Sequence, residues 1–285
     1  MIAVTGATGH LGRLVVTGLL DAGVPAAEVT ALVRDAGRAA DLAARGVTVR
    51  VADYTDRASL DAALSGVDRL LLVSGSEVGQ RVAQHTAVVE AAQAAGVDLL
   101  VYTSAPKALT STLVLAPEHK ATEELIAQAG IPAVVLRNNW YWENYDAQIG
   151  QAAATGQLAG SDHGGRAWPA ARADFAAAAV AVLTDPDVQP ATLELDGDAP
   201  FSLSDLAAEV GRQTGREVAF TDLSTEDHVQ LLRSVGLDEG TAGFVAAIDT
   251  GIAAGELDTG GSGISGLTGR PTRTLAEHVR AVLAG

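Results

Sequence analysis

Residues 1–14, "MIAVTGATGHLGRL", place glycines at positions 6, 9 and 12 between a short apolar run and an amphipathic stretch. The run at residues 2–4 predicts a strand, and the apolar residues Leu11, Val15 and Leu19 predict a helix after the glycines. A glycine has no Cβ, so the backbone can adopt positive φ and another group can approach it closely. The GxxGxxG spacing at this strand-to-helix turn therefore indicates a dinucleotide site, with the phosphates at the N-terminus of the helix.

Strand-like runs alternate with alanine-rich helical stretches through the first half of the chain. The runs cover residues 1–5, 29–33, 47–51, 69–73, 98–103 and 132–137. This alternation predicts the α/β class, with a Rossmann-type doubly wound parallel sheet. We expect the dinucleotide-binding domain to span residues 1–137, with returning segments near 166–196 that include a further strand at 191–195.

The pattern changes after Asn138, where aromatic residues and then a glycine-rich stretch follow. We expect residues 138–285 to form mostly a smaller C-terminal α/β lobe that binds substrate. Amphipathic spacing predicts helices at 202–214 and 225–235. Residues 250–269 are rich in Gly, Ser and Thr, so we expect them to be irregular.

Composition excludes several classes of protein. The 285 residues, 48% of them hydrophobic, can form a large core, while the net charge of −16 disfavours nucleic acid and anionic membranes as partners. The absence of cysteine excludes disulfides and thiolate metal sites and suits a reducing compartment. No apolar run approaches the roughly 20 residues of a membrane span. We expect a soluble, cytoplasmic monomer or homodimer with no membrane partner.

Arg34 ends the second strand, where an NAD-specific site usually has Asp or Glu. A guanidinium there favours the 2′-phosphate of NADPH, although NADH remains an alternative cofactor. The alternative interpretation is that Arg34 is a solvated surface residue whose charge is neutralised by Asp35. Asp53 ends the third strand and is placed to accept a hydrogen bond from an adenine amino group, or else to cap the next helix.

The residues that several other classes of enzyme need for catalysis are missing from this sequence. None of the four tyrosines has a lysine four positions later, so the Tyr/Lys pair of ordinary short-chain dehydrogenases is missing. There is no GxSxG elbow, and the six histidines do not have metal-ligand spacing. We therefore expect no metal site.

Ser104 and His119 are the candidate catalytic residues. Ser104 ends the fifth strand, and ligands bind at the carboxyl ends of strands in such sheets. His119 lies near the start of a predicted helix, whose dipole disfavours the charged imidazole and leaves a neutral hydrogen-bond donor. The alternative role for His119 is to cap that helix.

The segment "RNNWYWENY", residues 137–145, supplies the candidate substrate contacts. Its aromatic side chains provide flat walls for a planar substrate, although some of them must pack between the lobes instead. The residues that we expect to contact the substrate are Trp140, Tyr141, Asn144 and Tyr145.

Seven segments together resemble a known family: "MIAVTGATGHLG", "ADYTD", "SGSEVGQR", "YTS", "EHKATE", "LRNNWYWENY" and "RADFAAAA". In this order they are similar to the NmrA-like atypical short-chain dehydrogenases/reductases, above all the bacterial type 2 NAD(P)H:quinone oxidoreductases. The resemblance implies NADPH as cofactor, no flavin, a quinone as acceptor, and His119 near the nicotinamide. The cofactor contacts expected in total are Gly6, Thr8, Gly9, His10, Leu11, Gly12, Arg34, Asp53, Ser74, Gly75 and Thr103.

These observations predict an NADPH-dependent reductase that transfers hydride to a quinone or a similar conjugated carbonyl. A quinone needs little acid catalysis because its reduced anion is delocalised, which fits the missing tyrosine. One alternative is a ketone, imine or dye reductase of the same family. Another is a non-catalytic, NmrA-like regulator that senses dinucleotides.

Overall fold

The computed structural model describes residues 1–75, 77 and 79–285, and the chain separates into two compact units. The first unit comprises Met1–Ala108, Pro117–Asn138 and Arg172–Leu193. The second comprises Leu109–Ala116, Asn139–Ala171 and Glu194–Gly285. Each unit is therefore assembled from three separate stretches of the chain.

A seven-stranded sheet in the order β3-β2-β1-β4-β5-β6-β8 forms the centre of the first unit. Its neighbours from β3 to β6 pair in parallel, which confirms the predicted Rossmann-type fold. The strands are β1 (Ile2–Val4), β2 (Val29–Val33), β3 (Thr48–Val51), β4 (Arg69–Leu72), β5 (Leu99–Ser104), β6 (Ala133–Asn138) and β8 (Ala191–Leu195).

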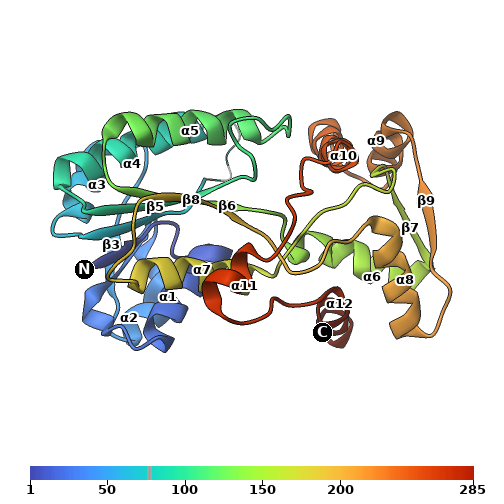
Figure 1. Ribbon diagram of the computed structural model, residues 1–285, viewed down its shortest axis with the longest axis horizontal. Helices are drawn as coiled ribbons and strands as arrows, with labels where there is room; N and C mark the ends of the chain where they lie inside the picture. The colour runs from blue at the N-terminus through green and yellow to red at the C-terminus, as the bar shows by residue number, and fades with distance from the viewer. Residues whose placement is uncertain (76, 78) are drawn as a thin grey trace. The chain divides into compact units, whose positions relative to one another are not determined.

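Helices cover both faces of this sheet. Figure 1 shows α3, α4 and α5 on one face and α1, α2 and α7 on the other. Asp56 caps α3 by accepting hydrogen bonds from the backbone N–H groups of Ala58 and Ser59. The helices are α1 (His10–Asp21), α2 (Ala40–Ala44), α3 (Arg57–Leu64), α4 (Arg81–Ala95), α5 (Ala116–Ala129) and α7 (Arg172–Thr184).

The second unit pairs two short strands in parallel and packs helices around them. Its strands are β7 (Gln157–Gly160) and β9 (Ala219–Asp222). Its helices are α6 (Asp146–Thr155), α8 (Leu203–Thr214), α9 (Thr225–Ser234), α10 (Glu239–Ala253), α11 (Gly263–Thr268) and α12 (Leu275–Ala284). The expectation that residues 250–269 are irregular is wrong at both ends, because α10 continues to Ala253 and α11 follows.

The position of the site follows from the order of the strands. The chain builds the sheet outward in one direction from β1 to β3 and in the other from β4 to β6, so the topology reverses between β1 and β4. Open α/β sheets bind ligands in the crevice at this point, outside the carboxyl ends of the strands. Within the described residues, no helix is both long and apolar enough to cross a membrane.

Candidate functional site

A cleft of about 590 Å³ opens where β1 and β4 end in the first unit. Its walls include all the expected cofactor contacts except Thr103. The lining residues outside that expected set are Leu32, Val33, Arg38, Ala52, Tyr54, Thr55, Val73, Glu77 and Gln84. The structure thus brings the glycine turn, Arg34, Asp53 and the end of β4 around one cavity.

The glycine turn is tight and places backbone groups without side chains at the cleft. Gly6 has φ +58°, and its carbonyl oxygen accepts a hydrogen bond from the Gly9 N–H at 2.8 Å. A Cβ on Gly12 would lie 2.4 Å from that oxygen, and one on Gly9 would lie 3.2 Å from it. Among the described residues, no side chain caps the start of α1. Its first N–H groups are therefore free of a side-chain acceptor at the cleft, as a bound phosphate requires.

Two arginines line the cleft beyond β2. Arg34 is highly exposed, and its guanidinium lies 3.4 Å from the Glu77 carboxylate. Asp35 accepts a hydrogen bond from the Gly37 N–H, and the carboxylate that pairs with Arg34 is that of Glu77. Neutralisation of Arg34 by Asp35 stays a prediction. Arg38, four positions after Arg34, also lines the cleft and is not among the expected cofactor contacts.

Asp53 lies at the end of β3 and holds a local turn. Its Oδ1 accepts hydrogen bonds from the backbone N–H and the hydroxyl of Thr55, at 2.8 and 2.7 Å. These bonds lower the pKa of the Asp53 carboxyl, so it is ionised at neutral pH. Asp56, not Asp53, caps the following helix. The contact of Asp53 with an adenine amino group stays a prediction.

The peptide after β4, which lines the cleft, is held in place by hydrogen bonds from neighbouring elements. The Gly75 N–H donates to His85 Nε2 at 3.1 Å, and the Gly75 carbonyl accepts from Arg81 Nε at 2.8 Å. The Ser74 N–H donates to the Thr103 hydroxyl at 2.8 Å. Thr103 is therefore not part of the cleft wall, and it positions Ser74 through this hydrogen bond.

A buried ion pair fixes Arg81 in turn. Arg81 Nη1 donates to Glu118 Oε2 at 2.8 Å, and the Gly79 N–H donates to Glu118 Oε1 at 2.8 Å. A buried guanidinium needs such a partner because desolvation of an unpaired charge is costly. The segment "SEVGQR" alone does not predict this role for Arg81, although Arg81 and His85 are four residues apart and share a face of α4. Positions 76 and 78 of this segment lie outside the described residues.

His119 lies in the first turn of α5 and is 5% exposed. Its Nδ1 is 2.8 Å from the Tyr102 hydroxyl on β5. Burial, followed by the Arg81 charge, lowers the pKa of His119 to about 3. The imidazole is therefore neutral, as predicted, but burial is the main cause and not the helix dipole. Its ring contacts β5, so a capping role has no support.

Ser104 is committed to a neighbouring ion pair. Its hydroxyl donates to Glu123 Oε1 at 2.6 Å. Arg137 binds the same carboxylate through two contacts, Nε to Oε1 at 3.0 Å and Nη2 to Oε2 at 2.6 Å. All three side chains are largely buried. The Ser104 proton already has a strong acceptor, which weakens the case for Ser104 as a donor to substrate.

The aromatic segment divides between core and partly exposed positions. Trp142 and Tyr145 are buried, and their rings lie 4.8 and 5.0 Å from the ring of Phe201. Burial raises the pKa of Tyr145 well above its usual value. The expected substrate contact of Tyr145 is therefore not supported, because the ring packs in the core of the second unit. Trp140 and Tyr141 are half-buried and stay predicted contacts, as does the exposed Asn144.

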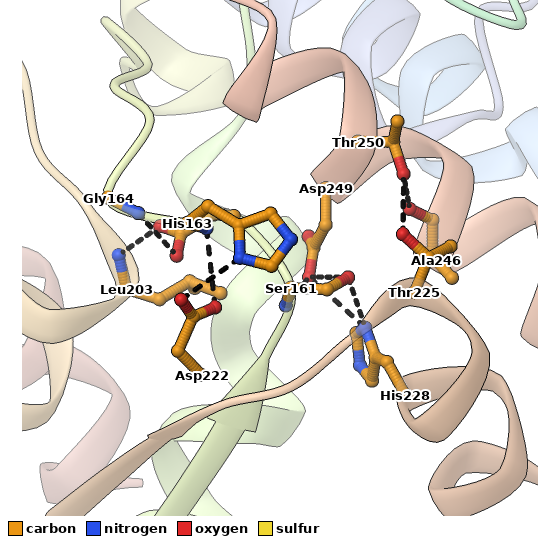
Figure 2. Close-up of polar contacts among 11 residues, drawn as sticks. Ser161, His163, Gly164, Leu203, Asp222, Thr225, His228, Ala246, Asp249 and Thr250 are labelled. Atoms are coloured by element: carbon orange, nitrogen blue, oxygen red, sulfur yellow. Dashed lines mark hydrogen bonds and ion pairs between the residues drawn. The ribbon is translucent and has the colours of Figure 1, made fainter.

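A cluster of Ser161, His228 and Asp249 in the second unit has the residue types of a hydrolase triad (Figure 2). Ser161 Oγ lies 2.9 Å and Asp249 Oδ2 lies 3.3 Å from the same nitrogen, His228 Nδ1. A nucleophilic triad needs the hydroxyl and the carboxylate on opposite ring nitrogens. All three residues are also buried, so the cluster ties β7, α9 and α10 together and does not activate a nucleophile.

The second unit contains another pocket, and the described residues hold no metal-binding cluster. A pocket of about 270 Å³ in the second unit lies beside Trp142 and Phe201, and none of the predicted substrate contacts lines it. Across residues 1–75, 77 and 79–285, no group of three or more His, Cys, Asp or Glu side chains is arranged to hold a metal ion.

Comparison with known proteins agrees with the dinucleotide site that the geometry indicates. The NmrA-like family model matches residues 1–248. Quinone oxidoreductase 2 of Escherichia coli (strain K12) is 47% identical over 98% of this chain and 97% of its own. The solved structure of the E. coli NADPH-dependent quinone oxidoreductase QOR2 with NADPH has a TM-score of 0.97, at 46% identity over 99% of this chain and 100% of that one. The Citrobacter sp. triphenylmethane reductase complexed with NADP(H) has a TM-score of 0.95, at 34% identity over 99% and 100%.

Proposed function

The chain belongs to the NmrA-like family, and from that premise we propose that it is an NADPH-dependent reductase of quinones or similar conjugated carbonyls. The observation that carries the proposal is the cleft at the reversal between β1 and β4, with two arginines beyond β2. The E. coli relative, which matches nearly the whole chain, is an NADPH-dependent quinone oxidoreductase and supports the same cofactor and substrate class here.

The residues of the cleft fit NADPH. The missing Cβ atoms of Gly9 and Gly12 allow the tight turn around the Gly6 carbonyl, and the uncapped start of α1 that follows it favours a pyrophosphate. Arg34 and Arg38 offer two guanidinium groups to the 2′-phosphate that distinguishes NADPH from NADH. When bound, this cofactor supplies a hydride.

We assign the hydrogen-bond donor for the acceptor oxygen to His119. Its imidazole is neutral because burial lowers its pKa, so it can donate N–H without a change of charge. Ser104 is the weaker candidate because Glu123 already accepts its proton. Trp140, Tyr141 and Asn144 are our proposed contacts for a planar acceptor. The cysteine-free sequence also supports our proposal that the protein works in the cytoplasm.

We propose that the reaction needs neither flavin nor metal. The cleft accounts for one dinucleotide, and the sequence contains no separate flavin motif. The purified protein should be colourless and should reduce quinone without added flavin. Stoichiometric flavin that is lost together with activity would contradict this.

Two alternatives differ in what the protein does with bound nucleotide. A dye reductase of the same family is favoured by the likeness to the Citrobacter enzyme. A regulator would bind dinucleotide and report to a partner without turnover.

One screen separates these readings. NADPH oxidation is measured with quinones, ketones, imines, and triphenylmethane and azo dyes, and NADPH binding is measured by calorimetry on the same sample. We expect the highest kcat/KM with a quinone. His119→Ala should lower kcat more than it weakens NADPH binding, by less than the roughly 100- to 1000-fold seen for donors to a localised oxyanion. Binding without oxidation of any acceptor would favour the regulator.

A further inference from the structure

Four polar side chains form a row on α5, and all of them except the partly buried Glu118 are buried. Their spacing, at i, i+1, i+4 and i+5, puts them on one side of the helix. The row consists of Glu118, His119, Thr122 and Glu123, and its partners on α4 and β5 are Arg81, His85, Tyr102 and Ser104. The row therefore connects the peptide at the end of β4 with His119.

The tautomer of His85 follows from its neighbours. The Gly75 N–H can only donate, so His85 Nε2, 3.1 Å away, must accept. Burial lowers the pKa of His85 to about 3, so the ring is neutral and its single proton is on Nδ1. That proton is donated to the Thr122 hydroxyl at 3.0 Å, and Thr122 donates its own proton to the Glu118 carbonyl at 2.9 Å.

Tyr102 and His119 share the next hydrogen bond, of 2.8 Å. Both groups are neutral, because burial raises the pKa of Tyr102 and lowers that of His119. The proton in this bond belongs either to the Tyr102 hydroxyl or to His119 Nδ1. An imidazole nitrogen is a stronger base than a phenol oxygen, and a phenol is a stronger acid than a neutral imidazole N–H. The stronger bond is therefore Tyr102 O–H to His119 Nδ1.

We infer that Tyr102 is a positioning residue, which holds His119 in the tautomer with its proton on Nε2. In this tautomer Nε2 donates to an electron-rich oxygen, whereas the opposite tautomer would present a lone pair and repel it. The inference rests on the proposed function only for the use of this donor. The tautomer itself is a property of the protein without substrate.

The tautomer can be measured directly. Protein labelled with ¹⁵N in histidine is examined near pH 7.5 by long-range ¹H–¹⁵N correlation, with His119 and His85 assigned from His119→Gln and His85→Gln. We expect the proton on Nε2 in His119 and on Nδ1 in His85, which serves as the internal reference. A proton on Nδ1 of His119 overturns the inference.

A variant tests the consequence for catalysis. Tyr102→Phe keeps the ring and removes the donor, so we expect a second tautomer of His119 to become populated. We also expect kcat with a quinone to fall roughly two- to tenfold, the worth of one hydrogen bond, with KM for NADPH unchanged. Thr30→Val is the matched control, because Thr30 Oγ1 is buried on β2 without a partner among the described residues.

The failures of the two proposals look different. If no acceptor is reduced, the proposed function fails while the measured tautomer still decides the assignment. If quinone is reduced and Tyr102→Phe changes neither the His119 signals nor kcat, the proposed function stands and Tyr102 has no positioning role.

Discussion

Arg34 and Glu77 form an ion pair of 3.4 Å at the cleft that both residues line. Their side chains are 74% and 52% exposed, so the pair contributes at most about 1 kcal/mol. A nucleotide phosphate carries more charge than the carboxylate and binds a guanidinium through two contacts. Arg34 is therefore held by a partner that a 2′-phosphate can displace.

Loss of Arg34 should reduce the preference for NADPH. A charge-assisted contact to phosphate contributes about 1.5–3 kcal/mol, so Arg34→Ala should lower the ratio of kcat/KM for NADPH over NADH roughly 10- to 100-fold. Steady-state kinetics with both cofactors measures this ratio. Arg45→Ala is the control, because Arg45 pairs with Asp21 away from the cleft lining. An unchanged ratio in Arg34→Ala would show that Arg34 is only a surface charge.

Removal of the Glu77 charge should have the opposite effect. In Glu77→Gln the phosphate no longer competes with a carboxylate for Arg34 or approaches a like charge, so we expect NADPH to bind about two- to tenfold more tightly. NADH, which lacks the 2′-phosphate, should bind almost unchanged. Calorimetric titration of both nucleotides tests this, with Glu124→Gln on the exposed side of α5 as control. Equal gains for the two nucleotides would contradict the role of Glu77.

A methyl group at position 12 should disrupt the glycine turn. Because the Cβ of Gly12→Ala would lie 2.4 Å from the Gly6 oxygen, we expect the free energy of unfolding to fall by about 1–3 kcal/mol. NADPH binding should weaken at least about tenfold. Gly150→Ala in α6 meets no atom within 4 Å and should instead stabilise by roughly 0.5–1 kcal/mol. Chemical denaturation and titration report both quantities, and similar results for the two variants would be inconsistent with this steric argument.

The buried histidines should make the protein less stable in mild acid. Burial lowers the pKa of His85 and of His119 to about 3, whereas an unfolded histidine titrates near 6.5. Between these values the unfolded chain binds more protons, so stability that is complete above about pH 6.5 is lost as the pH falls toward 3. Each histidine adds a slope of up to about 1.4 kcal/mol per pH unit.

Denaturation curves between pH 7.5 and 5 measure this slope before most carboxylates titrate. His85→Gln should reduce the slope of the free energy of unfolding against pH by the contribution of one histidine. This holds even if the variant is less stable at every pH. A free energy of unfolding that does not change over this range would mean that the two rings can be protonated without cost.

The sequence predicted the sheet of the first unit well because its signal is local. Each strand is a short apolar run between helix stops, and β2, at Val29–Val33, matches its expected range. The glycine turn was also predictable, because a bare backbone at a strand-to-helix junction has few other uses.

The second unit was less predictable because its elements depend on distant contacts. Helix α10 contains Gly251, a poor helix former, whose missing Cβ leaves space for Leu113. The strands β7 and β9 are four residues each and pair across about 60 positions, without a strong apolar pattern. The sequence predicts a substrate contact for Tyr145 because it does not reveal Phe201 beside that ring.

The packing of α1 against α7 has a consequence for the folding of the chain during its synthesis. The apolar side chains of α1, among them Val15, Val16 and Leu19, are fully buried in the first unit, where α1 packs against α7. Helix α7 begins only at Arg172, after the ribosome has made α6 and β7. A nascent or truncated chain that ends at residue 138 therefore lacks the helix against which α1 packs. Such a fragment should depend on chaperones or aggregate, and the nucleotide cleft should become stable only when residues 172–184 have emerged.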